Sequence, residues 1–339
     1  MSTYIVVFVG VLLLAVVGTP LARKLGLRLH TVDQPDPTRR VHTIPTPRLG
    51  GVAIFLSTLI VTLLLGERYN VSQLAGTLIG ATLMSFMGLW DDRFSLPAGV
   101  KLIGQFIALG LLIITGVSIR ILPHPMLNLL VTALWVVGIT NAFNLLDNMD
   151  GLSGGIAAIA AAHFALMCAF TGQYLVGALS VAVMAACIGF LVYNWTPATI
   201  FMGDSGALFL GFVLAAIGIK VDFPQNIPIV TWMVPLLVLA VPIFDTTLVT
   251  ISRLKRGLNP LTTPGLDHTS HRLTYAGLTR REAVLVLYTV AFGAGLVAIF
   301  ITRATVWEGY LVGALAGIIA LYGLWRMERP PFWPPDTKK

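Results

Sequence analysis

Residues 174–193 read YLVGALSVAVMAACIGFLVY, twenty consecutive positions without a charged side chain. A helix needs about 20 predominantly apolar residues to cross the hydrocarbon core of a bilayer. A surface helix of a soluble protein keeps one polar face, because that side meets water. This stretch therefore predicts a membrane-spanning helix, and the rest of the chain extends the same pattern.

The composition excludes an ordinary soluble protein. The 339 residues are 56% hydrophobic and only 11% charged, with a mean hydropathy of +0.86. A soluble domain carries about 25% charged residues. So few charges cannot cover a water-facing surface, so we expect an all-α integral membrane protein with one polytopic domain over residues 1–339.

Eleven segments qualify as spans by length and apolarity. They lie near residues 3–22, 49–66, 72–90, 101–118, 126–143, 153–171, 174–193, 205–220, 228–251, 283–302 and 308–325. The first is not followed by a small-residue cleavage site, so we expect a retained anchor and not a removable signal peptide. Cys168 and Cys187 lie inside apolar stretches and predict neither a metal site nor a disulfide.

Basic residues alternate between the loops that join these spans. The rich set carries 18 Lys and Arg residues and comprises 23–48, 91–101, 141–152, 194–204, 252–282 and the tail after 325. The other loops carry four. Cytoplasmic loops hold the excess of basic residues in membrane proteins, so we expect the N-terminus outside and the C-terminus in the cytoplasm. The same rule explains the net charge of +7 without a nucleic acid, which we do not expect as a partner.

Acidic residues and amides gather in the same loops. Asp91 and Asp92 end an apolar helix, where charge is costly and a functional role is the default interpretation. Paired carboxylates can hold Mg²⁺ or act as a base toward a phosphate or hydroxyl group. The alternative is a carboxylate pair that is simply solvated at the membrane interface.

The 141–152 loop holds a second polar set. Asp147 and Asp150 are three residues apart, as are Asn141 and Asn144, so each pair shares one face of a helical turn. Together they form a dense set of oxygen ligands. A plain polar turn explains four such groups within ten residues less well.

The stretch 201–206 reads FMGDSG and opens the span at 205–220. Asp204 or Ser205 can cap that helix. The alternative is a functional role. The free N–H groups at the start of the helix would attract an anion, the glycines would let that anion approach the backbone, and Asp204 would bind a metal. That arrangement would suit a diphosphate with Mg²⁺.

Two basic loops are candidates for phosphate contacts. In the first, Arg39, Arg40 and Arg48 can grip phosphate oxygens with the guanidinium fork, although positive-inside anchoring explains a single arginine equally well. In the 252–282 loop, two histidines and an arginine within five residues can bind a phosphate or stabilise charge in a transition state. No cysteine or further histidine pattern supports zinc in this loop.

Other polar residues receive mainly structural interpretations. Thr279 and Glu282 fit a capping box at the start of the tenth span. His163, in the middle of a span, is expected to be a satisfied interior histidine. Asp245, near the inner end of its span, is either functional or orients a neighbouring side chain.

Taken in order from Asp33 to about Leu273, these segments resemble the polyprenyl-phosphate N-acetylhexosamine-1-phosphate transferase superfamily. The motifs are Asp-x-Pro…Arg-x-His…Pro-x-Pro-x-x-Gly-Gly, the Asp-Asp pair, Asn-x-x-Asn-x-x-Asp-x-x-Asp-Gly, Gly-Asp-Ser-Gly and the histidine loop. Each alone is modest evidence, but five in order on one expected side of the membrane are specific. The chain is most similar to the UDP-N-acetylglucosamine–undecaprenyl-phosphate transferases, which are related to the phospho-N-acetylmuramoyl-pentapeptide transferases.

The resemblance implies a reaction. N-acetylglucosamine 1-phosphate passes from UDP-N-acetylglucosamine to polyprenyl (undecaprenyl) phosphate and UMP leaves, the first membrane step of cell-envelope polysaccharide synthesis. It implies Mg²⁺, with Mn²⁺ as an alternative, and a multi-pass protein of the inner (plasma) membrane with a cytoplasmic active site. It leaves a homodimer open.

The resemblance also implies roles for single residues. Asp204 matches the metal-binding aspartate, and Asn144 helps to hold the metal. Matching positions of a catalytic kind are Asp91, Asp92, Asp147, Asp150, His268 and His271. Positions that contact substrate are Arg40, His42, Lys101, Asn141, Asn144 and Arg272. Together they place the active site on loops 23–48, 91–101, 141–152, 194–204 and 252–282.

Two positions depart from the family pattern. Ser270 stands where a histidine is common, and Asn148 stands where many members have glycine. The sparser histidine run argues against the muramoyl-pentapeptide enzymes and favours UDP-N-acetylglucosamine as donor, although another UDP-N-acetylhexosamine stays open. Two alternatives of other classes are a transporter of lipid-linked or nucleotide sugars and a non-catalytic scaffold or receptor. The carboxylates at inner helix ends and the lack of a visible repeat favour the transferase.

Overall fold

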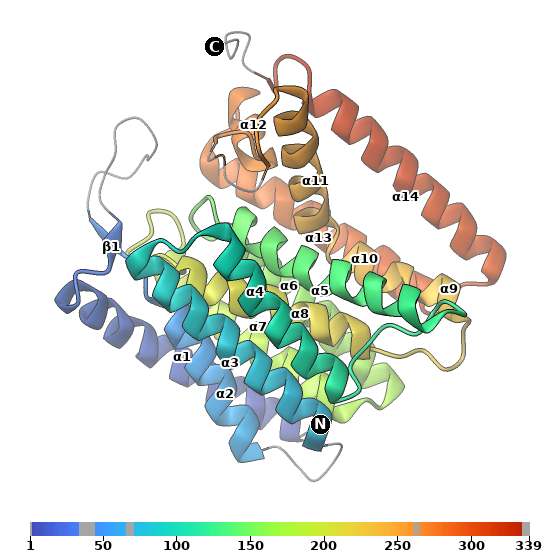
Figure 1. The fold of residues 1–339 in the computed structure, drawn as a ribbon, viewed down its shortest axis with the longest axis horizontal. Coiled ribbons are helices and arrows are strands. Elements are labelled where there is room, and N and C mark those ends of the chain that lie inside the picture. The colour runs from blue at the N-terminus through green and yellow to red at the C-terminus, as the bar shows by residue number, and fades with distance from the viewer. Residues whose placement is uncertain (1, 34–44, 66–70, 261–262, 264, 334–339) are drawn as a thin grey trace. The chain divides into compact units, whose positions relative to one another are not determined.

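The computed structural model describes the chain except for residues 1, 34–44, 66–70, 261–262, 264 and 334–339. It divides into two compact units, Met1–Asp222 and Phe223–Lys339. Helices dominate both units (Figure 1). Within the described residues, eight helices are long and apolar enough to cross a membrane. The chain is therefore an all-α membrane protein, as its composition predicts.

Unit 1 is a bundle with one small two-stranded sheet. Its elements are α1 (Ser2–Arg28), β1 (Val32–Asp33), β2 (Thr46–Pro47), α2 (Gly50–Leu65), α3 (Val71–Phe94), α4 (Ala98–Ile114), α5 (Pro125–Leu146), α6 (Leu152–Thr171), α7 (Tyr174–Asn194) and α8 (Gly203–Lys220). Each of the first eight expected spans overlaps one of these helices. Two of them, α2 and α4, are shorter than the other six.

Unit 2 holds the remaining helices. They are α9 (Pro228–Thr231), α10 (Met233–Val238), α11 (Ala240–Lys255), α12 (Thr269–Tyr275), α13 (Arg280–Ile301) and α14 (Val306–Met327). The expected span at 228–251 is not one straight helix, because a bend of 76° separates Pro228–Val238 from Ala240–Lys255. Pro242 has no N–H to donate to the carbonyl four residues earlier, at Val238, and its ring clashes there. Val238 is accordingly the last residue of α10.

The interior of unit 1 is formed by α6 and α8. In each, 78% of the apolar window is buried inside the protein, and α8 packs against α2, α3 and α5. Trp135 of α5 donates its Nε1–H to the carbonyl of Ala215 at 3.0 Å. In contrast, none of the corresponding window of α14 is buried, which suits a helix whose apolar side chains face lipid.

Glycines bring the ends of three helices unusually close. A Cβ on Gly51 of α2 would lie 2.1 Å from the backbone nitrogen of Gly206 in α8. A Cβ on Gly88 of α3 would lie 2.3 Å from the carbonyl oxygen of Asp204. The N-terminus of α8 is thus wedged between α2 and α3, and only glycine fits at these contacts.

Several local expectations are confirmed. Thr279 and Glu282 form a complete capping box at the start of α13. Both cysteines are free and buried. His163 is 5% exposed, and its Nδ1 lies 2.8 Å from the carbonyl oxygen of Ile159. In the first polar loop, β1 and β2 pair antiparallel with Asp33 opposite Thr46.

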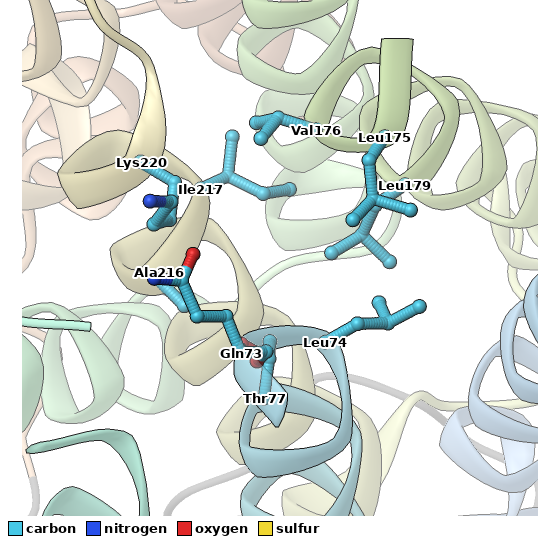
Figure 2. A pocket seen from close by; sticks show the side chains of 9 residues that line it. All are labelled: Gln73, Leu74, Thr77, Leu175, Val176, Leu179, Ala216, Ile217 and Lys220. Carbon is cyan, nitrogen blue, oxygen red and sulfur yellow. The ribbon is translucent and has the colours of Figure 1, made fainter. Parts of the chain in front are cut away.

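A cavity of about 40 Å³ lies between the start of α3, the start of α7 and the end of α8 (Figure 2). Apolar side chains line most of it, with Gln73, Thr77 and Lys220 as its polar members. Lys220 is sixteen residues from Asp204, or about 24 Å along the helix at 1.5 Å per residue. The cavity is therefore remote from the polar residues at the other end of α8.

Candidate active site

The acidic cluster of unit 1 comprises Asp91 and Asp92 of α3, Lys101 of α4, Asn144 of α5 and Asp204 of α8. These residues stand at the last turns of α3 and α5 and at the first turns of α4 and α8. Loops that are far apart in sequence therefore bring together five of the residues that the sequence predicts.

Lys101 connects two of the carboxylates. Its Nζ forms an ion pair with Asp91 and lies 3.0 Å from Oδ2 of Asp204. Lys101 keeps 23% of its side chain exposed and Asp204 keeps 29%, whereas Asp91 is largely buried. The accessible part of the acidic cluster thus consists of an ammonium group beside a carboxylate, which can meet a phosphate from solution.

Asp92 has a different role from its neighbour. Its carboxylate accepts hydrogen bonds from the backbone N–H groups of Asp204 at 3.0 Å and Ser205 at 3.2 Å. These are free donors at the start of α8, where the helix dipole also favours a negative charge. The expectation that Asp204 or Ser205 caps α8 is wrong, because neither side chain caps the helix and Asp92 of α3 accepts its free N–H groups.

The sequence predicts an anion at the start of α8, and the structure places the carboxylate of Asp92 there. Gly203 adopts φ +72°, and a Cβ there would lie 2.6 Å from Oδ2 of Asp92. The glycines of the FMGDSG stretch therefore serve the approach of neighbouring helices. The site available to a ligand begins at the Asp204 side chain.

The 141–152 loop supplies further polar groups. Asn144 is close enough to Asp204 to donate a hydrogen bond to its carboxylate. Burial, followed by the negative charge of Asp204, raises the pKa of Asp147 to about 7. Asp150 accepts a hydrogen bond from the backbone N–H of Ala198 at 3.0 Å. Asp147 thus lies beside the acidic cluster, whereas Asp150 holds the 194–204 loop in place.

Asn141 is paired inside the protein. Its Nδ2 donates to Oε1 of Gln105 at 2.7 Å, and Nε2 of Gln105 donates back to Oδ1 of Asn141 at 3.2 Å. Gln105 is 1% exposed. Because Gln105 lies one turn after Lys101 and Asn141 one turn before Asn144, this amide pair joins α4 to α5 directly beside the acidic cluster.

The first polar loop contributes Arg48. Asp33, which is 6% exposed, forms an ion pair with Arg48 across the small sheet. The positive charge of Arg48 acts on both Asp92 and Asp147. Arg39, Arg40 and His42 lie outside the described residues, so their expected substrate contacts stay predictions.

The donor set suits a metal that binds together with a substrate. The described residues contain no group of three or more His, Cys, Asp or Glu side chains arranged to hold a metal. Mg²⁺ is usually held by one or two carboxylates, with waters and substrate phosphates completing its shell. The Asp204 carboxylate and the Asn144 amide oxygen fit that incomplete shell. Lys101 shows that the position already attracts a cation.

In unit 2, the predicted histidines lie on and beside α12. Nδ1 of His268 lies 2.8 Å from Oδ2 of Asp245, and the Thr269 N–H donates to Oδ1 of the same carboxylate at 2.6 Å. Asp245 thus orients a neighbour, one of its two expected roles. The ring centroids of His268 and His271 are 6.2 Å apart. Burial, followed by the charge of His268, lowers the pKa of His271 to about 4, so its ring is neutral at neutral pH.

Arg272 is buried and forms hydrogen bonds within unit 2. It is 0% exposed, its Nε donates to the carbonyl of Asp267 at 2.8 Å, and its Nη1 contacts Met327 and Glu328. Its Nη2 has no hydrogen-bond partner among the described residues, yet it is fully buried. These contacts give Arg272 a structural explanation, and its expected substrate contact stays a prediction.

The sequence analysis missed three partners of residues in or beside the site. Gln105 pairs with Asn141, and Asn194 bridges the Gly151 N–H to the Ile200 carbonyl at 2.9 Å each. In unit 2, Arg253 holds Asp267 with two hydrogen bonds of 3.0 and 2.8 Å. A lone amide inside an apolar run, such as Gln105, is a signal that could have been read. The partner of each charged residue could not be predicted, because several residues of opposite charge were available for each ion pair.

Comparisons with known proteins identify relatives over most of the chain. The model of glycosyl transferase family 4 matches residues 74–222. A probable undecaprenyl-phosphate N-acetylglucosaminyl 1-phosphate transferase of Bacillus subtilis is 35% identical, over 91% of this chain and 87% of its own length. A decaprenyl-phosphate N-acetylglucosaminephosphotransferase of Mycobacterium tuberculosis is 32% identical, over 93% and 87%. An undecaprenyl-phosphate alpha-N-acetylglucosaminyl 1-phosphate transferase of Yersinia pestis is 26% identical, over 91% and 88%.

Proposed function

The chain belongs to glycosyl transferase family 4, and we propose that it transfers N-acetylglucosamine 1-phosphate from UDP-N-acetylglucosamine to polyprenyl phosphate. One observation carries the proposal beyond the relatives' names. In a protein with very few charges, Asp91, Lys101 and Asp204 contact one another at the ends of three apolar helices. A lipid phosphate and a water-soluble diphosphate can both reach such a position.

The reaction needs little chemistry from the protein. An oxygen of the lipid phosphate attacks the phosphorus that carries the sugar, the bond to the UMP oxygen breaks, and UMP leaves. A phosphate monoester has its second pKa near 6, so the nucleophile is already ionised at neutral pH and a strong base is unnecessary. Positioning and charge stabilisation then supply most of the catalysis, as in other phosphoryl transfers.

The described residues divide this work. Lys101 is placed to neutralise charge on a phosphate, while Asp91 holds the lysine in position. Asp204 and Asn144 would hold Mg²⁺. When bound, the metal would neutralise the diphosphate and stabilise charge on the departing UMP. Asp147, Asp150, His268 and His271 keep their proposed catalytic assignment, and a neutral His271 would act as a hydrogen-bond partner of the donor.

We also propose the full topology that the loop charges indicate. Eight long helices, the bent pair and two shorter apolar helices would make eleven crossings. The 18-to-4 split of basic residues supports an outside N-terminus, a cytoplasmic C-terminus and a cytoplasmic acidic cluster. The inner membrane is the expected location, since polyprenyl phosphate is a bilayer lipid and the nucleotide sugar is water-soluble.

The test is a donor screen on purified protein. Detergent-solubilised enzyme with Mg²⁺ and polyprenyl phosphate should release UMP from UDP-N-acetylglucosamine and form a lipid diphosphate sugar in equal amount. Asp204→Ala should lower the rate at least 1,000-fold, because the substrate diphosphate would lose its metal, while Gly138→Ala should not. Folded wild-type protein that releases no UMP from any UDP-N-acetylhexosamine would refute the proposed function.

A further inference from the structure

The helix α12 is too short to hold its own shape. It spans seven residues, Thr269–Tyr275, and isolated helices shorter than about 12 residues are marginal in water. His268 precedes this helix and His271 lies within it. The position of both rings must therefore be fixed by contacts with other elements of unit 2.

One of those contacts is at the start of α12. Asp245 of α11 binds the His268 ring and the Thr269 N–H. This contact holds the first residues of the helix. It leaves the following turn, which carries His271 and Arg272, to be held by something else.

Arg272 is held by the segment that follows α14. Its Nη1 donates to the carbonyl of Met327 at 2.7 Å and to Oε1 of Glu328 at 2.9 Å. Its guanidinium carbon lies 4.2 Å from the centre of the Trp333 ring, within the range of a cation–π contact. Met327 is the last residue of α14, so Arg272 also satisfies a carbonyl that the helix leaves free.

The contact is centred on a buried arginine. Arg272 is 0% exposed, and Trp333 also stacks on Arg256 at 5.1 Å. Arg256 in turn pairs with Asp267, the residue that directly precedes His268. The segment Met327–Trp333 therefore reaches the histidines by two routes, through Arg272 within α12 and through Arg256 and Asp267 before it.

We propose that the segment Met327–Trp333 is a latch that positions the histidine helix for the transfer reaction, with Glu328, Trp333 and Arg272 as positioning residues. The proposal rests on the proposed function for its kinetic consequence. The latch itself is a structural statement about unit 2. It assigns a role to the end of the chain, which carries none of the family motifs.

Hydrogen–deuterium exchange tests the latch without reference to activity. Trp333→Leu and Glu328→Ala should each speed exchange at the backbone amides of residues 268–276 by about tenfold in the full-length protein. The matched control is Trp307→Leu, which removes a tryptophan that is 80% exposed in the first turn of α14, twenty residues or about 30 Å along the helix from Met327. Unchanged exchange in both latch variants would refute the latch, whether or not the protein is an enzyme.

Steady-state kinetics tests the consequence for the reaction. Trp333→Leu should lower kcat for UMP release about five- to thirtyfold, Trp333→Phe should recover most of it, and Trp307→Leu should stay within twofold of wild type. In a His271→Ala background, Trp333→Leu should cost less than twofold, because the ring that it positions is gone. If Trp333→Leu lowered kcat by the same factor in the His271→Ala background as in wild type, its effect would not act through His271, which would contradict the positioning role. An inactive wild type would refute the proposed function and leave the exchange result to decide the latch.

Discussion

Asp91 and Asp92 are neighbours in sequence with separate tasks. Asp91 accepts the backbone N–H of Leu96 at 2.6 Å and pairs with Lys101. Asp92 turns the other way and accepts two N–H groups at the start of α8. Because consecutive residues of a helix point about 100° apart, one Asp-Asp pair can serve a cation and a helix terminus together.

Substitution of Asp92 should show whether its carboxylate caps α8 or acts as a general base in the reaction. Asparagine keeps one acceptor oxygen for the α8 N–H groups, so Asp92→Asn should lower UMP release by about 10- to 100-fold. Asp204→Asn should cost at least tenfold more, because a bound metal would lose its charged ligand. Rates measured at saturating Mg²⁺ decide this. Equal losses in the two variants would contradict the capping role.

At the scale of elements, the ends of α2, α3 and α8 meet through glycine. This contact fixes the direction in which Asp204 leaves the backbone relative to Asp92 and Lys101. The glycines of two separate motifs, Gly51 and Gly206, are therefore the two sides of one helix contact.

A methyl group at this contact should damage both stability and activity. Gly51→Ala would put a Cβ 2.1 Å from a backbone nitrogen that cannot move away, and such overpacking costs about 1–3 kcal/mol or more. Thermal unfolding in detergent should shift down by several degrees, and UMP release should fall at least tenfold.

The matched control is Gly138→Ala in α5, where nothing lies within 4 Å of the added Cβ. Alanine is the better helix former by about 1 kcal/mol, so this variant should be as stable as wild type or more so. If Gly51→Ala behaved like Gly138→Ala, the close helix contact would be disproved.

The Arg253–Asp267 ion pair at the base of α12 should make unit 2 acid-sensitive. Burial alone would raise the pKa of Asp267, but the hydrogen bonds and charge of Arg253, with His268 and Arg256, hold it at about 2. Since the folded pKa is below the ordinary 3.8, the stabilisation is complete above about pH 5 and disappears as the pH falls toward 2. It amounts to about 2 kcal/mol.

The measurement compares wild type with Asp267→Asn by chemical unfolding in detergent between pH 5 and pH 2.5. The stability gap between the two proteins should shrink by about 1.5 kcal/mol over this range, since the pH stays above the folded pKa. Carboxylates elsewhere titrate in both proteins and cancel in the difference. A gap that is independent of pH would contradict the low pKa of Asp267.

At the scale of the whole molecule, the distribution of charge gives a topology that can be tested directly. In a protein with Cys168 and Cys187 replaced by alanine, a cysteine at Arg303 should react with a membrane-impermeant maleimide on intact cells. A cysteine at Leu258 should react only after the membrane is opened. The reverse pattern would overturn the proposed orientation, and labelling of both from outside would overturn the span count between them.

The predicted span at 228–251 shows where pattern alone falls short. Its hydropathy is continuous, and the prolines at 228, 235 and 242 are visible in the sequence. Membrane helices often tolerate proline, so the prolines did not by themselves predict a bend of 76°. The bend depends on whether neighbouring groups satisfy the carbonyls that proline leaves unpaired.

The sequence by itself determined the fold class, the positions of the long apolar helices and the gathering of polar groups in a few loops. These follow from local rules, because a bilayer admits only segments of the right length and polarity, such as 174–193. Only the tertiary structure decided which partner each charged residue takes. Asp92 binds a helix terminus, Lys101 joins Asp91 to Asp204, and Arg272 is held by the end of the chain. Each choice is made by the approach of elements that are distant in sequence, and no local pattern encodes that approach.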